Sequence, residues 1–182
     1  MRRVFLCFAA AQLLLFVGTG VVGVARLESP PERHMLLGIF TLLLSCFIQV
    51  MVFTYFTVTG KMLGQALHLM KTDIHPLLES KRIKRGVTRL LAATVLSLLA
   101  VTITGAIQWR SNRFAEIHWT AVVVALAVHA GAYYVQYSSI VLNSRLLGEI
   151  LDRYTAMRKR REAPDNISRP NVTALQESAN TP

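Results

Sequence analysis

The residues best suited to chemistry in this chain are polar side chains placed inside long apolar stretches. In VHAGAYYVQYSS, residues 128–139, a histidine, a tyrosine and a glutamine follow one another at spacings of four and three, which places them on one face of a helix. Two further glutamines stand inside the first two apolar stretches. An unpaired polar group in hydrocarbon costs several kcal/mol, so these side chains should turn inward. We therefore predict one buried polar cluster, formed by Gln12, Gln49, His129, Tyr133 and Gln136.

Two interpretations of this cluster stay open. The first is structural, because polar side chains between helices in a membrane form hydrogen bonds worth about 0.6 kcal/mol each. The second is a quinone, proton or haem site, because ionisable residues inside a membrane are often functional. No aspartate or glutamate lies deep in any apolar stretch, which disfavours an ion-coupled transporter. The structural interpretation is the one we favour.

The histidines permit one further ligand hypothesis. Haem b with two histidine ligands needs those histidines on different helices at one depth. His129 has no such partner, but His34 and His118 both stand near the outer ends of their apolar stretches. An outer haem held by this pair is the alternative reading. His68 and His75 stand seven residues apart and form too weak a pattern to predict a metal site.

The usual motifs of catalysis and cofactor binding offer little. No CxxC, HExxH or P-loop string appears. The two cysteines, Cys7 and Cys46, lie inside apolar runs, where they are expected to act as small buried hydrophobes rather than as a disulfide. We therefore predict no catalytic centre, bound metal or cofactor. We expect that the protein is not an enzyme.

Composition indicates an integral membrane protein. Of 182 residues, 53% are hydrophobic and 16% are charged, far from the composition of a disordered chain. A membrane span needs roughly 20 apolar residues. The fold class we expect is an all-α, four-transmembrane-helix antiparallel bundle, with spans at about 4–25, 34–59, 87–108 and 114–142. The first could instead be a cleaved signal peptide, but it is longer than the apolar core of such peptides.

The distribution of basic residues predicts the topology. The net charge of +10 would suggest nucleic acid in a soluble protein, but its placement follows the positive-inside rule, and no nucleic-acid partner is expected. Sixteen Lys and Arg residues lie in the N-terminus, the 60–89 segment and the tail, against four on the other side. Both termini should therefore be cytoplasmic. The membrane we expect is the inner, cytoplasmic membrane of a bacterium.

The helical pattern continues past the apolar stretches. Residues 60–86 and 143–161 keep an apolar stripe at helical spacing, which predicts a cytoplasmic helical stalk. Some of that stripe would remain free to dock a partner. Its members are Leu63, Leu67, Met70, Leu147, Leu151 and Tyr154. Residues 1–162 would form one helical membrane domain, and the Pro-, Asn- and Ser-rich segment 163–182 a disordered tail.

Two functions from different classes remain. The first is a non-enzymatic multi-pass membrane protein, a structural or accessory subunit or scaffold, whose partners are the lipid bilayer and either another protein or a second copy of itself. The second is a redox-chain membrane anchor that binds quinone or haem b within the bundle. The sequence favours the first, because it contains helical extensions but no catalytic constellation.

Overall fold

The computed structural model describes residues 1–24, 31–71, 74–110 and 115–162 of the chain. These residues form four helices, α1 (Arg2–Val24), α2 (Pro31–Met70), α3 (His75–Arg110) and α4 (Ala115–Glu162). The expected all-α class is confirmed for the described part of the chain. All four helices are long and apolar enough to cross a membrane. The expected tail, 163–182, lies outside the described residues.

The helix ends follow from local chemistry. α2 begins at Pro31 and α3 carries Pro76 in its first turn, where the missing N–H of proline costs no helical hydrogen bond. α2 ends at Met70 because the next residue, Lys71, adopts the left-handed conformation, with φ of 52°. The backbone N–H of Lys71 then donates to the carbonyl oxygen of His68 at 3.3 Å, which closes the last turn.

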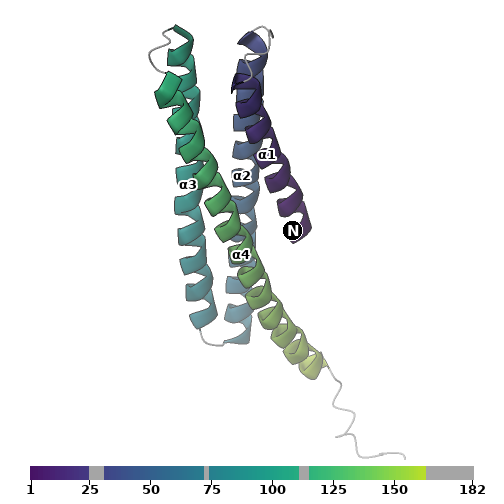
Figure 1. Cartoon of the computed structure of the whole chain (residues 1–182). Helices are drawn as coiled ribbons and strands as arrows, with labels where there is room; N and C mark the ends of the chain where they lie inside the picture. Colours follow the sequence, from purple (N-terminus) through teal and green to yellow (C-terminus); the bar gives the residue numbers. More distant parts are fainter. Residues whose placement is uncertain (25–30, 72–73, 111–114, 163–182) are drawn as a thin grey trace, which may run out of the picture.

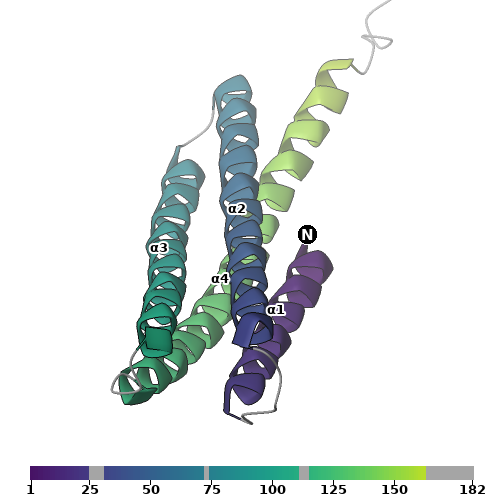
Figure 2. The ribbon, with the colours of Figure 1, turned by 90° about the horizontal axis from the view of Figure 1, so that it is seen from above.

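The four helices form an elongated bundle (Figure 1). At one end α1 and α3 finish while α2 and α4 begin, and we call this the hairpin end. α1 has 23 residues against 40 in α2 and 48 in α4, so α1 reaches only part of the way along the bundle. Beyond it the bundle continues as three helices. We call this part the stalk, and it comprises residues 60–70, 75–86 and 143–162. α4 crosses its neighbours at an angle, and its final turns project past them (Figure 2).

Three apolar clusters follow one another along the bundle. Phe16, Leu98 and Ala125 form the centre of the cluster toward the hairpin end. The middle cluster is the largest, and contains Phe5, Ile48, Val52, Phe56 and Ile140 among others. The stalk cluster draws on α2, α3 and α4.

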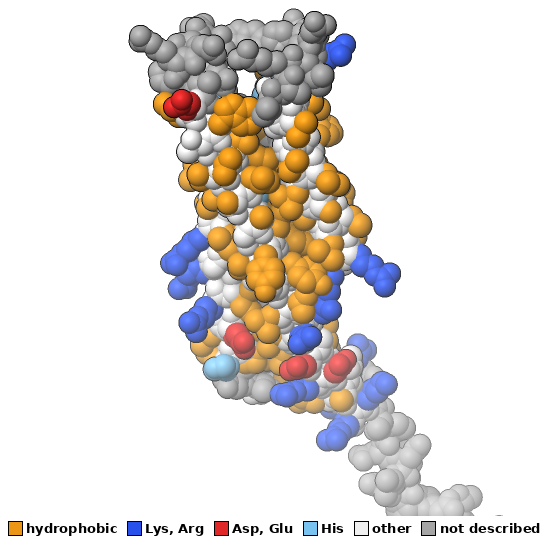
Figure 3. All heavy atoms as spheres, in the orientation of Figure 1, with side chains coloured by type: hydrophobic (Ala, Val, Ile, Leu, Met, Phe, Trp, Pro, Cys, Tyr) orange, Lys and Arg blue, Asp and Glu red, His pale blue; other side chains and the backbone are white. Residues whose placement is uncertain are grey.

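The surface of the bundle has two halves of different character. Hydrophobic side chains dominate the half toward the hairpin end, whereas most of the visible Lys and Arg side chains stand out from mid-height onward (Figure 3). Many large apolar side chains in the first half are more than half exposed, among them Leu14, Phe40, Leu43 and Leu96. A surface of this extent marks contact with lipid or with another protein.

Candidate functional site

The five residues of the expected polar cluster are all buried in the middle of the bundle. Gln12 comes from α1, Gln49 from α2, and His129, Tyr133 and Gln136 from α4. Their side chains are between 0 and 4% exposed. Because these polar side chains are buried, they need hydrogen-bond partners within the protein, either on a neighbouring helix or at a carbonyl oxygen of their own helix.

Gln49 and Gln136 bind each other directly. Nε2 of Gln136 donates to Oε1 of Gln49 at 2.8 Å. This bond uses one polar atom of each amide. Nε2 of Gln49 and Oε1 of Gln136 are buried and have no partner.

Both ring nitrogens of His129 have hydrogen-bond partners within the protein. Its Nδ1 lies 2.8 Å from the carbonyl oxygen of Ala125, one turn earlier in α4. A carbonyl oxygen only accepts, so Nδ1 carries the hydrogen and, in the neutral ring, Nε2 accepts from the hydroxyl of Ser45 at 3.3 Å. The rings of Phe16 and Tyr133 pack against it with centroids 5.8 Å away. This histidine is therefore positioned as a packing and hydrogen-bonding group.

The remaining polar atoms of the cluster lack hydrogen-bond partners. Both polar atoms of Gln12 and the hydroxyl of Tyr133 are buried without a hydrogen-bond partner. The Tyr133 hydroxyl lies near Ser45 but outside hydrogen-bonding geometry. Each such group costs about 1–3 kcal/mol when left unpaired in the folded protein. The five side chains are thus buried together in the middle of the bundle without forming one hydrogen-bonded network, because the Gln49–Gln136 bond is separate from the bonds of His129, and Gln12 and the Tyr133 hydroxyl bond to none of the others.

A second polar junction lies where the stalk begins, and it is complete. Ser80 in α3 donates to Oδ1 of Asn143 at 2.9 Å, and Nδ2 of Asn143 donates to the hydroxyl of Thr59 in α2, also at 2.9 Å. The hydroxyl of Thr59 passes its own hydrogen to the carbonyl oxygen of Tyr55. Asn143 therefore links three helices. Asn143 follows Gln136 by seven residues, so the two share a face of α4, but its partners lie 63 and 84 residues away, where no local pattern could reveal them.

His34 and His118 lie at the hairpin end, in the first turns of α2 and α4. Each ring packs against a glycine of the preceding helix. A Cβ placed on Gly23 would stand 2.7 Å from Cε1 of His34, and one on Gly105 would stand 3.0 Å from Cε1 of His118. Nδ1 of His118 lies 3.2 Å from the hydroxyl of Thr104, whereas Nδ1 of His34 is buried without a partner. Residue spacing alone does not predict that these two glycines receive the histidine rings.

Gly23 also closes the string GTGVVG, residues 18–23, whose glycine spacing is that of a dinucleotide-binding turn. Such a turn must lie between a strand and the start of a helix, where its backbone N–H groups are free. Here the whole string lies inside α1. It is a set of small helical residues and cannot cradle a phosphate.

Most of the apolar stripe of the stalk is buried between the helices of the stalk. Leu63, Leu67 and Met70 of α2 are buried, and Leu147 and Tyr154 of α4 pack against them. Leu151 is half-buried. Their role as a docking surface for a partner stays a prediction, and what they supply in this structure is the core that holds α2 and α4 together.

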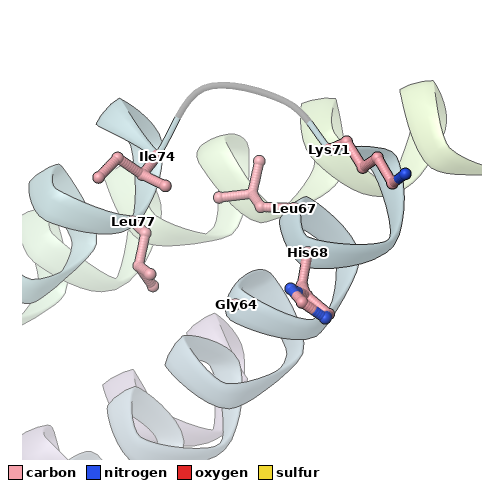
Figure 4. Close-up of a pocket in the computed structure, with 6 residues that line it drawn as sticks. All are labelled: Gly64, Leu67, His68, Lys71, Ile74 and Leu77. Atoms are coloured by element: carbon pink, nitrogen blue, oxygen red, sulfur yellow. The ribbon is translucent and has the colours of Figure 1, made fainter.

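A groove of about 420 Å³ opens at the tip of the stalk, between the end of α2 and the start of α3 (Figure 4). Leu67, Ile74 and Leu77 supply its apolar lining, and His68 and Lys71 lie on its α2 side. Ile74 is 60% exposed. The lining residues are Gly64, Leu67, His68, Lys71, Ile74 and Leu77.

Within the described ranges, no group of three or more His, Cys, Asp or Glu side chains is placed to hold a metal ion. Cys7 and Cys46 are free thiols, with Cys7 exposed rather than buried as we expected. No protein-family model, no curated protein and no solved structure matches this chain. The described residues form a four-helix bundle with a polar centre, two histidines that each pack against a glycine, and a groove at the tip of the stalk.

Proposed function

We propose that this protein is a multi-pass membrane protein that serves as a non-enzymatic accessory subunit or scaffold, docking a cytoplasmic partner at the tip of its stalk. The observation that carries the proposal is the apolar groove at the stalk tip, which lies far from the apolar half of the surface and exposes Ile74 beside Lys71.

Membrane insertion as an antiparallel four-span bundle is supported by helix length and surface. α2, with 40 residues, is about 60 Å long at 1.5 Å per residue, twice the roughly 30 Å of a bilayer core. The half toward the hairpin end suits lipid, since its large exposed side chains are apolar. Lys84 reaches back to this boundary, where its ammonium group lies 5.0 Å from the ring centroid of Phe53 and bonds to Thr57 at 3.1 Å.

An orientation with both termini in the cytoplasm follows from charge. The basic residues of 60–89 and of the end of α4 belong to the stalk or its border, so the positive-inside rule puts the stalk in the cytoplasm. A bacterial inner membrane is the location we propose.

The groove suggests the chemistry of its occupant. Leu69, Ile74 and Leu78 are each more than half exposed at the tip, in a region expected to face water. Exposed apolar side chains beside a cavity indicate a protein-binding surface. Lys71 at the rim adds positive charge. The occupant we propose is an amphipathic protein segment that places apolar side chains in the groove and a carboxylate beside Lys71.

A photo-crosslinking amino acid at Ile74, in the full chain and in native membranes, tests this role. We expect a covalent adduct to one protein. The matched control carries the cross-linker at Arg153, which is also an exposed stalk residue but does not line the groove. An adduct of twice the chain mass would identify the partner as a second copy. Equal labelling from both positions, or none from Ile74, would refute docking at the groove.

A second candidate is a redox-chain anchor that holds a quinone at the polar centre, and the unpaired atoms there favour it. A quinone offers two carbonyl acceptors, and Gln12 Nε2, Gln49 Nε2 and the Tyr133 hydroxyl are buried donors without acceptors. Lipid extraction of the purified protein followed by chromatography would detect bound quinone. Retention in the parent and loss in a Gln12→Leu variant would support this function, and absence from the parent would exclude it.

A further inference from the structure

The two histidines at the hairpin end occupy equivalent places in the bundle. α2 begins at Pro31 and α4 at Ala115, so His34 and His118 are each the fourth residue of their helix. Both helices begin at the same end of the bundle (Figure 1). α2 and α4, which carry the two imidazoles, are in direct contact along the bundle. His118 is 7% exposed, and Nδ1 of His34 is buried.

The orientation of His118 is fixed by α3. The Thr104 hydroxyl lies 2.8 Å from the carbonyl oxygen of Ala100 and 3.0 Å from that of Val101, and its one hydrogen goes to them. Its oxygen therefore accepts from Nδ1–H of His118, at 3.2 Å. In the neutral ring this leaves Nε2 with a lone pair. A hydrogen bond to one ring nitrogen that directs the other toward an electrophile is the usual support of a metal-ligating histidine.

Gly23 and Gly105 leave the space that the imidazole rings of His34 and His118 occupy. Any side chain at Gly105 would bring a Cβ to 3.0 Å from His118, and any at Gly23 to 2.7 Å from His34, so each ring lies flush against a neighbouring helix. The hairpins α1–α2 and α3–α4 thus each contribute one histidine and one glycine to the same end of the bundle.

The surroundings are apolar on the side toward the stalk. Val122 follows His118 by one turn of α4, and Val101 precedes Gly105 by one turn of α3. Both pack against the cluster of Phe16, Leu98 and Ala125, to which Leu42 and Leu126 also belong. Side chains from all four helices therefore pack together next to the histidine pair and form an apolar layer on that side of it.

From these observations we infer that the hairpin end binds one haem b, with His34 and His118 as axial ligands from α2 and α4. A bare zinc ion would need three or four protein ligands, and the described residues place no such group anywhere. Haem iron takes four nitrogens from its porphyrin and needs only two from the protein. The inference uses residues of the hairpin end alone, so it is independent of docking at the stalk.

The test is the absorption spectrum of the full chain, purified from membranes of haem-replete cells. We expect a Soret band and, on reduction, an α band, with about one haem per chain by pyridine haemochrome assay. His34→Leu and His118→Leu should each abolish the bands. His68→Leu, a stalk histidine, is the matched control and should leave them unchanged.

Two further variants separate ligation from folding. His118→Met keeps an iron ligand, so it should retain the haem with a shifted α band and a raised reduction potential. Gly105→Leu keeps both histidines but displaces the His118 ring, so it should weaken haem binding. Circular dichroism and elution volume establish that each variant is folded. Parent protein without a Soret band, even after hemin is added, would overturn the inference. So would bands that survive in the double His34, His118 variant, or a bound metal without porphyrin.

Discussion

Nε2 of Gln136 donates a hydrogen bond of 2.8 Å to Oε1 of Gln49, between two side chains that are fully buried in the middle of the bundle. This bond joins the α1–α2 hairpin to the α3–α4 hairpin. Ser45 and His129 make a second bond between the same two helices, 3.3 Å long. The two hairpins are therefore aligned by polar contacts, and any shift of α4 along α2 would leave these groups unpaired.

Replacing both glutamines of the pair should destabilise the bundle by less than the sum of the two single replacements. Gln49→Met or Gln136→Met keeps the side-chain volume but strands the other amide, at a cost of about 1–3 kcal/mol. The double variant removes both partners, so its loss should be smaller than the sum of the single losses. Unfolding by SDS in mixed micelles measures all three. Strictly additive losses would show that the bond contributes nothing.

Gln12→Met should behave differently, because Gln12 makes no hydrogen bond within the described residues. Its removal strands no partner and takes two unpaired polar atoms out of the interior, so the free energy of unfolding should rise by about 1–3 kcal/mol. The same SDS titration, on protein from native membranes, provides the comparison. A loss as large as that of Gln49→Met would mean that Gln12 holds a ligand or an ordered water.

The helices and their inward faces were predictable because a helix repeats every 3.6 residues, so the spacing of Gln49 from Ser45, or of Tyr133 from His129, reports a shared face. Pairing between helices was not predictable. Ser45 and His129 are 84 residues apart, and Tyr55 and Ser144 are 89 apart. Which polar atoms meet depends on rotation and height of each helix, which sequence periodicity does not fix.

In the stalk too, residue spacing predicted the buried apolar stripe but not the exposed groove. The apolar stripe through Leu63 and Leu67 was visible at the spacing of a helix, and it became the stalk core. Ile74 continues the spacing of Leu63, Leu67 and Met70, yet its side chain is exposed at the tip, because α2 ends at Met70. The groove lies between the end of α2 and the start of α3, and residue spacing does not fix how these two helix ends face each other.

Asn143→Leu should loosen the stalk from the rest of the bundle. The change leaves the hydroxyl of Ser80 without an acceptor and that of Thr59 without a donor, at a cost of about 1–3 kcal/mol for each buried group. Hydrogen exchange should quicken first at the start of α3. Ser138→Ala is the control, since Ser138 is exposed and bonds only to its own helix. Unchanged exchange in the Asn143 variant would contradict the junction.

His129→Leu should fold and keep its function. The variant loses the bonds to Ser45 and Ala125 but fills an apolar space beside Phe16, so we expect a loss of about 1–2 kcal/mol in stability. Complementation of a deletion strain is the functional readout, with helicity measured in parallel. A variant that is folded and abundant yet fails to complement would give His129 a chemical role.

The proposed function depends most on the membrane topology of the chain, which a tag fused after Pro182 can measure. With the stalk and both termini in the cytoplasm, a protease added to intact spheroplasts should spare the tag and remove it only after lysis. A cysteine introduced at Arg33, an exposed residue of the hairpin end, should in the same cells react with a membrane-impermeant maleimide. Removal of the tag without lysis, together with an unreactive Arg33→Cys chain, would contradict the account.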